Sequence, residues 1–444
     1  MKDRDQLVRM GMSPTQATAK ASMLAACDEA LDVLGSSAQR WSVWVPGRIE
    51  LLGKHTDYAG GRSLLCTVER GFAVRVALRT DALIRAVDVT SKSSYVTALD
   101  PTADTPEAGW GNYVATVARR LARNFPCARC GVDLAFSSDL PIAAGMSSSS
   151  ALMIAVFVAL AKSNDLRSSE EFRRAIFSRE ELASYLGTVE NGESFRTLEG
   201  NVGVGTFGGS QDHTAIMCAE SGHVVQYSFS PVRREAAYVL PPTHTFVVGA
   251  CGVLAEKTAG AREGYNRAAL MVRHLLASWN EATGRQDATL ADAARSADDA
   301  RDRLRGVATL AATPDFSGVA LGNRLEQFLL ESFELIPEAA SILARGAIGE
   351  LGAVVDRSQA AAELWLGNQI PETIALARLA RELGADAASS FGAGFGGSVW
   401  ALVAVGDAEA FSHEWAARYA KAFPGAAARS IFFVSPAGPG ANQF

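Results

Sequence analysis

One short stretch of the chain, residues 46–61, crowds polar side chains between glycines. It follows the apolar run 41–45 and holds an arginine, a lysine, a histidine, a threonine, an aspartate and a tyrosine among four glycines. A segment that only has to fold does not need so many donors and acceptors at such close spacing. We therefore predict that residues 46–61 form the floor of a site for a small polar ligand.

A second cluster of small polar residues, 140–152, leads into an apolar run at residues 151–161. Gly145 precedes four consecutive serines, and the apolar run predicts a buried helix. Unpaired N–H groups and the dipole at a helix start favour an anion. The serine hydroxyls could add contacts to phosphate oxygens or Mg²⁺, although one serine there could simply cap the helix. No Gly-Lys-Ser/Thr follows, so this is a phosphate loop of another kind than Walker A.

A glycine-rich segment precedes a candidate catalytic acid. Residues 200–209 hold five glycines, and Asp212 follows them shortly after. Such a density of glycine indicates a backbone packed close to a ligand or to another segment. Asp212 is a candidate general base or charge partner, whereas a lone aspartate after glycines is usually a turn residue. We expect the neighbouring His213 to be structural.

The glycine run that begins at Gly392 matches two common nucleotide-binding patterns but lies in the wrong context for both. The dinucleotide motif needs a helix after it, and here an apolar, strand-like run follows. The protein-kinase motif needs a strand lysine, an HRD loop and a DFG, which the chain lacks. The remaining interpretation is a glycine loop of close approach before a buried strand.

The elements that must position these loops alternate between strands and helices, which predicts an α/β (α+β) fold. Residues 110–121 form an amphipathic helical pattern, and alanine-rich helices dominate from residue 257 to 383. We divide the chain into a helical extension at 1–25, a domain at 26–235 and a domain at 236–444. Apolar alternation predicts strands at residues 41–45, 71–78, 84–89, 132–137, 245–250 and 430–434.

The composition narrows the class of protein. A chain of 444 residues with 48% hydrophobic and 20% charged residues suits a soluble protein of two domains. The net charge of −6 offers no general attraction for nucleic acid or anionic membrane. No apolar run is long enough to span a bilayer, and the charged start lacks a signal-peptide core, so we expect a cytoplasmic enzyme. The scattered cysteines predict free thiols rather than a zinc site.

The order of the motifs resembles the GHMP superfamily of small-molecule kinases. Residues 47–58 follow the galactokinase signature nearly position for position, 141–152 resemble the family's ATP-phosphate loop, and 391–403 its third motif. Shorter matches lie at residues 110–114, 265–267 and 440–441. The resemblance covers about residues 30–441 and implies a two-domain fold with the active site in the cleft between the domains.

The resemblance also implies a role for each matching residue. Asp212 would act as base or orienting charge at the sugar's anomeric hydroxyl, and Arg48 would pair with it and stabilise the transferring phosphoryl group. Glu190 with Ser148 or a neighbour would hold Mg²⁺. The implied sugar-binding residues are Lys54, His55, Asp57 and Tyr265. The implied nucleotide-binding residues are Gly145, Ser147, Ser148, Ser149 and Gly394.

The function implied is an ATP- and Mg²⁺-dependent sugar 1-kinase that phosphorylates galactose or a related hexose. Its partners would be the sugar and ATP, with no nucleic acid and no membrane, and the protein would be a monomer or weak homo-oligomer. An alternative of another class is a sugar sensor without catalysis. Such a protein should show damage in the phosphate loop or at the catalytic acid, and here Gly145 and Asp212 are present.

The chain departs from the galactokinase pattern at three places. Lys54 stands where galactokinases have a glutamate that binds the C6 hydroxyl, Asp212-His213 replaces Asp-Gln, and residues 389–391 replace Arg-Met-Thr. A cation beside C6 would suit the carboxylate of galacturonate. Lys54 could also point to solvent or pair with Glu50, which leaves galactose as the substrate.

Overall fold

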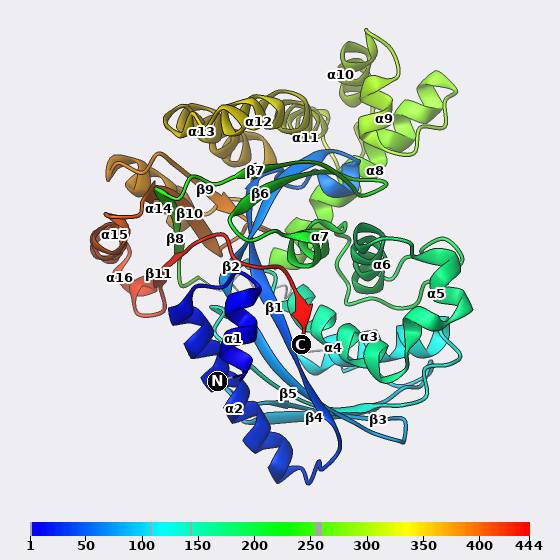
Figure 1. Cartoon of the computed structure of the whole chain (residues 1–444). Helices are drawn as coiled ribbons and strands as arrows, with labels where there is room; N and C mark the ends of the chain where they lie inside the picture. Colours follow the sequence, from blue (N-terminus) through cyan, green and yellow to red (C-terminus); the bar gives the residue numbers. More distant parts are fainter. Residues whose placement is uncertain (1, 107–108, 143, 254–259) are drawn as a thin grey trace.

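Two β-sheets share one hydrophobic core in the computed structural model, which describes residues 2–106, 109–142, 144–253 and 260–444 (Figure 1). The first sheet has the order β12-β1-β2-β5-β3-β4, with β6 on β2 and β7 on β6. Its strands are β1 (Arg40–Leu52), β2 (Arg62–Leu78), β3 (Leu83–Asp88), β4 (Ser93–Ala98), β5 (Val132–Ser138), β6 (His223–Ser228), β7 (Arg233–Val239) and β12 (Asn442–Gln443). The second sheet has the order β11-β8-β10-β9, with β8 (His244–Ala250), β9 (Ala387–Phe391), β10 (Ser398–Ala404) and β11 (Ile431–Ser435).

Helices cover both faces of the first sheet because side chains alternate between its faces. Ala77 and Ala135 pack against Cys27 and Leu31 of α2, and the neighbouring Leu134 joins the core on the other side. That other side is covered by α4, which contacts β1 and β2. The helices around the first sheet are α1 (Lys2–Arg9), α2 (Pro14–Val33), α3 (Gly111–Asn124), α4 (Ser148–Ser163), α5 (Glu170–Ala175), α6 (Arg179–Asn191) and α7 (Gln211–Cys218).

The second sheet is joined to the first through its inward face. Trp400 of β10 is fully buried, and its Nε1 donates to the main-chain oxygen of Glu50 in β1 at 3.1 Å. The neighbouring Val399 and Ala401 face a separate cluster with α14 and α15. The helices of this half are α8 (Gly260–Thr283), α9 (Leu290–Arg295), α10 (Ala300–Leu310), α11 (Gly318–Leu330), α12 (Ile336–Arg345), α13 (Leu351–Ala361), α14 (Pro371–Glu382), α15 (Ala408–Ala422) and α16 (Pro424–Ala427).

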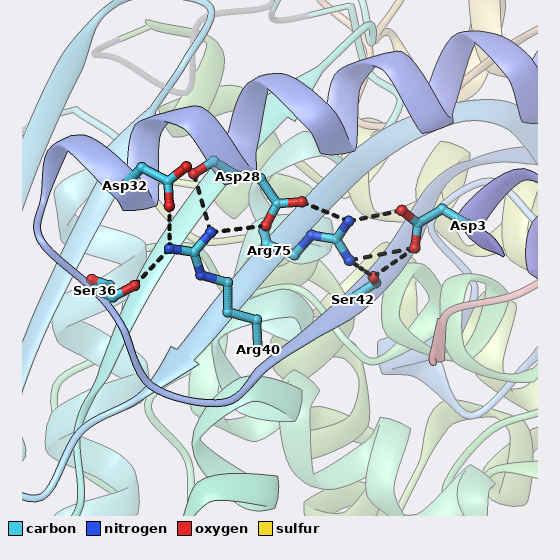
Figure 2. A network of polar contacts seen from close by, with 7 residues as sticks. All are labelled: Asp3, Asp28, Asp32, Ser36, Arg40, Ser42 and Arg75. Carbon is cyan, nitrogen blue, oxygen red and sulfur yellow. Dashed lines mark hydrogen bonds and ion pairs between the residues drawn. The ribbon is translucent and has the colours of Figure 1, made fainter. Parts of the chain in front are cut away.

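Ion pairs fasten the N-terminal helices to the first sheet (Figure 2). Arg75 of β2 lies between Asp3 of α1 at 2.8 Å and Asp28 of α2 at 2.9 Å. Arg40 of β1 pairs with Asp28 and with Asp32. The expected boundary at residue 25 therefore falls inside α2, a continuous helix that packs on β2 and β5.

The mixed α/β class agrees with the sequence, and the predicted buried helix at 151–161 is the body of α4. The division of the chain into domains stays a prediction, and its boundary at 235/236 falls within β7. The first three residues of the predicted helical region, 257–259, lie outside the described residues. Within the described ranges, no helix is long and apolar enough to cross a membrane.

Candidate active site

A cavity of about 340 Å³ lies where the four loops singled out in the sequence meet. The stretch 46–61 contributes to its wall, together with the serine loop, the segment before α7 and the loop between β9 and β10. Tyr265 of α8, Glu190 of α6, and Trp110 and Tyr113 at the start of α3 also line it. Segments far apart in the sequence thus come together around one polar space.

An ion pair at the cavity joins two of these loops. Arg48 of β1 donates from Nε and Nη2 to Oδ1 of Asp212, at 2.9 and 2.8 Å. Its Nη1 donates to the main-chain oxygen of Gly145 in the serine loop. The Arg48 side chain is nearly buried, while that of Asp212 stays 30% exposed. The guanidinium therefore holds a reachable carboxylate beside the start of α4.

The loop after β1 presents a buried carboxyl and a neutral imidazole. Oδ2 of Asp57 accepts the N–H of Gln211 at 3.0 Å, and burial raises the pKa of Asp57 to about 6. Burial lowers the pKa of His55 to about 3, so this ring is neutral near pH 7. Because the Ala393 carbonyl can only accept, His55 donates to it from Nε2 at 3.2 Å, and Nδ1 accepts from the Tyr58 hydroxyl at 2.9 Å.

Tyr265 closes this side of the cavity. Its ring lies 5.3 Å from that of His55. Its hydroxyl leaves no room for a side chain at Gly208, where a Cβ would stand 2.2 Å from the oxygen. The glycines before α7 are thus needed because the backbone passes directly over the polar residues of the wall.

The serine loop turns sharply into α4. Gly145 and Ser147 have positive φ angles of 71° and 60°, and the helix begins at Ser148. Ser148 and Ser149, which form the first turn of this helix, line the cavity, and the N-terminus of a helix is suited to binding phosphate groups. The adjoining residue 143 lies outside the described residues.

The loop between β9 and β10 packs against the serine loop. A Cβ on Gly392 would stand 2.6 Å from the main-chain oxygen of Gly145, and Ser398 donates from Oγ to the oxygen of Ala144 at 2.7 Å. The close approach predicted for this glycine run is therefore an approach to the phosphate-type loop.

Glu190 lies behind the serines. Its carboxylate accepts from Oγ of Ser150 at 2.7 Å and from Oγ of Ser149 at 3.4 Å. Nε2 of His213 stands 3.3 Å from Oε2 of Glu190. A carboxylate next to serine hydroxyls is a set of hard oxygen ligands, the kind that Mg²⁺ prefers. No group of three or more His, Cys, Asp or Glu ligands occurs in the part of the chain that the structure describes.

Comparisons with known proteins match the two segments of the chain that carry most of these site residues. The family model for the GHMP kinases N terminal domain matches residues 112–219, and the galactokinase galactose-binding signature matches residues 33–78. The galactokinase of Actinobacillus pleuropneumoniae serotype 5b is 36% identical over 123 residues, 27% of this chain and 31% of that protein. That of Haemophilus influenzae (strain PittEE) is 32% identical over 117 residues, 26% of this chain and 30% of that protein. Residues 33–78 and 112–219 of this chain are thus similar to the corresponding segments of galactokinases and GHMP kinases.

Solved structures extend the likeness in fold beyond the matched segments. The Lactococcus lactis galactokinase in complex with galactose has a TM-score of 0.76 at 22% identity, covering 95% of this chain and 99% of that one. The Methanococcus jannaschii mevalonate kinase has a TM-score of 0.53 at 13% identity, covering 90% and 98%. The chain thus has a GHMP-kinase fold, whereas its alignment with the two curated galactokinases spans less than a third of their length.

Two predicted site residues do not line the cavity. Lys54 is 1% exposed and donates from Nζ to Oγ of Ser358 at 2.9 Å, which places its ammonium among the C-terminal helices. The prediction that Lys54 binds the sugar is therefore corrected. The two alternatives, that Lys54 points to solvent or pairs directly with Glu50, are corrected as well. Gly394 packs on Asn368 instead, and Gly392 and Ala393 are the members of its loop on the wall.

The structure adds wall residues that the sequence reasoning did not assign. Glu50, Tyr58 and Gln211 all line the cavity. Glu50 could have been found, because it follows Arg48 by two positions on a strand and so shares its face. Gln211 could not, since its role depends on how the glycine segment folds back onto β1.

Proposed function

We propose that this protein is an ATP-dependent sugar kinase that transfers the γ-phosphoryl group to the anomeric hydroxyl of galactose or a related hexose. The observation that carries the proposal is the Arg48–Asp212 pair, which stands beside the phosphate-type loop and inside the cavity. Phosphoryl transfer requires aligned reactants, neutralised charge and a group that accepts the proton of the nucleophile.

Asp212 is proposed to accept a hydrogen bond from the sugar hydroxyl and to take its proton as the new O–P bond forms. Arg48 binds Oδ1 of Asp212 and so holds this carboxylate at the cavity wall. The same guanidinium lies close to Gly145, where a nucleotide phosphate would bind, and it would offset the charge on the transferred group. His55, Asp57 and Tyr265 would position the sugar ring.

The N–H groups at the start of α4, with Ser147, Ser148 and Ser149, would hold the phosphates of ATP. Ser148 and Glu190 would hold Mg²⁺, because both lie at the cavity and offer oxygen ligands. The ion would neutralise phosphate charge when bound. Hydrogen bonds from Ser149 and Ser150 hold the Glu190 carboxylate in this structure.

Galactose is the sugar that the relatives favour. Both curated relatives named above are galactokinases, and the Lactococcus lactis structure contains galactose. The uronate alternative depended on Lys54 as a cation beside the sugar, and Lys54 is instead bonded to Ser358 outside the cavity wall. We therefore rank a neutral hexose first.

The test is ADP release from ATP and Mg²⁺ over a panel of hexoses, with the product position read by NMR. We expect turnover of galactose or a close relative, and a loss of about 10²- to 10⁴-fold in kcat for Asp212→Asn. Asp287→Asn is the matched control, since Asp287 pairs with Arg285 away from the cavity. Sugar binding by the wild type without ADP release would instead establish the sensor.

A further inference from the structure

A buried carboxylate in the cavity wall has one oxygen without a partner. Glu50 follows Arg48 on β1, lines the cavity and is 3% exposed. Its Oε2 accepts from Nε2 of Gln211. Its Oε1 has no hydrogen-bond partner among the residues that the structure describes. A buried carboxylate oxygen in this state is costly, so a donor is expected to reach it in the working protein.

The charges around Glu50 do not supply that donor. Arg48 directs its N–H groups to Asp212 and Gly145, and Lys54 directs its ammonium to Ser358. Both cations favour the ionised carboxylate from a distance, while Glu331 and Asp212 oppose it. Burial outweighs these charges and raises the pKa of Glu50 to about 7. The main-chain oxygen of Glu50 is already taken by Trp400.

The donor can therefore come from the cavity itself. We propose that Glu50 is a substrate-contacting residue whose Oε1 accepts a hydrogen bond from a hydroxyl or ammonium group of the sugar, selecting such a sugar over a uronate. This inference rests on the proposed function and adds the class of substrate to it. Asp57 and Tyr265, which the resemblance implicates, leave this oxygen unused.

The chemistry of the wall agrees with that class. A sugar carboxylate placed at Oε1 would meet a second anion, with Asp57 and Asp212 in the same cavity. A hydroxyl or ammonium donor satisfies the oxygen, and its hydrogen bond favours the ionised form of Glu50. Selection of this kind is strong, because the wrong ligand leaves a buried polar group unpaired or repelled.

The experiment measures kcat/KM of the wild type and Glu50→Gln for galactose, its 2-, 3-, 4- and 6-deoxy forms, galactosamine and galacturonate. Glutamine keeps the shape and can still accept from Gln211, but it replaces a charged acceptor. We expect kcat/KM for the parent sugar to fall about 10- to 100-fold with the KM for ATP unchanged. For one deoxy sugar, the substitution should cause little further loss, which identifies the bonded hydroxyl.

Glu69→Gln is the matched control. Glu69 is a buried glutamate of β2 that binds Ser13 away from the cavity. Any decrease of kcat/KM in Glu69→Gln should therefore be the same for every sugar. If Glu50→Gln does not fold, Glu50→Asp replaces it, because aspartate keeps the carboxylate on a shorter side chain. Its loss of kcat/KM is then compared between the parent sugar and each deoxy form in the same way.

The outcomes separate the two proposals. Equal losses for all analogues would show that Glu50 acts through the fold or a water molecule, which overturns this inference and leaves the kinase intact. A wild-type preference for galacturonate would also overturn it. A wild type that phosphorylates no sugar overturns the proposed function and this inference with it.

Discussion

Gln211 connects two carboxyl groups of the cavity that burial makes hard to ionise. Its N–H donates to Asp57 and its side-chain amide to Glu50, and burial raises the pKa of both acids, to about 6 and about 7. Asp212 of the same cavity is partly exposed and paired with Arg48. A residue beside the proposed catalytic acid thus organises the wall on which the sugar would rest.

The raised pKa of Glu50 predicts a dependence of stability on pH. The folded protein holds the Glu50 proton between pH 4.5, its ordinary pKa, and about 7. Glu50 therefore destabilises the fold increasingly as pH rises through this window, by about 3 kcal/mol above it. Below pH 4.5 this cost is absent. Glu50→Gln should gain stability over the wild type from pH 4.5 to 8, measured by urea unfolding.

The difference in the free energy of unfolding between the wild type and Glu50→Gln reports on Glu50 alone. Asp57 and His55, whose pKa values are also shifted, titrate in both and cancel to first order. Parallel stability curves for the two proteins across this range would show that Glu50 is not desolvated.

Among the elements, the loop between β9 and β10 and the serine loop before α4 support each other. The positive φ of 84° at Gly392 and the oxygen of Gly145 both require glycine there. Gly392→Ala should raise the KM for ATP about 10-fold or more, since the Cβ would push the phosphate-type loop away.

The matched control for this change is Gly346→Ala. Gly346 also has a positive φ, of 66°, but a Cβ there meets nothing within 4 Å. Gly346→Ala should lower the free energy of unfolding by about 1 kcal/mol because of backbone strain, and it should leave the KM for ATP unchanged. Equal effects of both substitutions on the KM for ATP would refute the contact with Gly145 as their cause.

The N-terminal helices depend on Arg75, which ties α1 and α2 to β2 (Figure 2). Arg75→Met removes the cation that Asp3 and Asp28 share, and of these two only Asp28 keeps an ion pair with Arg40 among those described. We expect the free energy of unfolding to fall by about 1–3 kcal/mol, read by urea titration, with the helices more open to proteolysis.

An exposed ion pair gives the comparison for Arg75. The side chains of Arg174 and Glu170 are 72% and 69% exposed, so Arg174→Met should change stability by no more than about 0.5 kcal/mol. If Arg75→Met cost as little, the network in Figure 2 would not hold the helices to the sheet.

On the scale of the whole molecule, helices from the C-terminal half hold the loop after β1. Arg324 donates to the His55 carbonyl, Gln327 to the Lys54 carbonyl at 3.0 Å, and Glu331 accepts the Gly53 N–H at 2.7 Å. The site is therefore assembled only when α11 and the π-helical turn Glu331–Leu335 are in place.

Lys54 belongs to this assembly. Its ammonium reaches Glu331 through Ser358, so Lys54→Met should lower stability by about 3 kcal/mol and leave the galactose-to-galacturonate ratio of kcat/KM unchanged. Lys20→Met is the matched control, because Lys20 is an equally buried lysine that pairs with Asp139 at 2.5 Å. If the galactose-to-galacturonate ratio of kcat/KM changed tenfold in Lys54→Met but not in Lys20→Met, Lys54 would have to contact the sugar.

Local chemistry was readable without the structure in several places. The serine loop before α4 and the close approach of the loop at Gly392 follow from glycine placement, whereas the pairing of Arg48 with Asp212 was implied by the resemblance to the GHMP kinases. Lys54 was misplaced because a residue type does not reveal which way a buried loop turns its side chain. The role of Glu50 was not predicted from the sequence, because the apolar pattern ends at residue 45 while β1 continues to Leu52.

The amino-acid sequence by itself determined the α/β class and the loops that could hold a phosphate, because alternation and glycine geometry act over short distances. The strand predicted at residues 41–45 continues in the structure to Leu52 and so carries Arg48. The tertiary structure alone decided which of the many polar groups meet. The desolvation of Glu50, the turn of Lys54 toward Ser358 and the bonds of Gln211 all depend on segments more than a hundred residues away. Burial and charge at a site are sums over the folded neighbourhood, and no local pattern contains them.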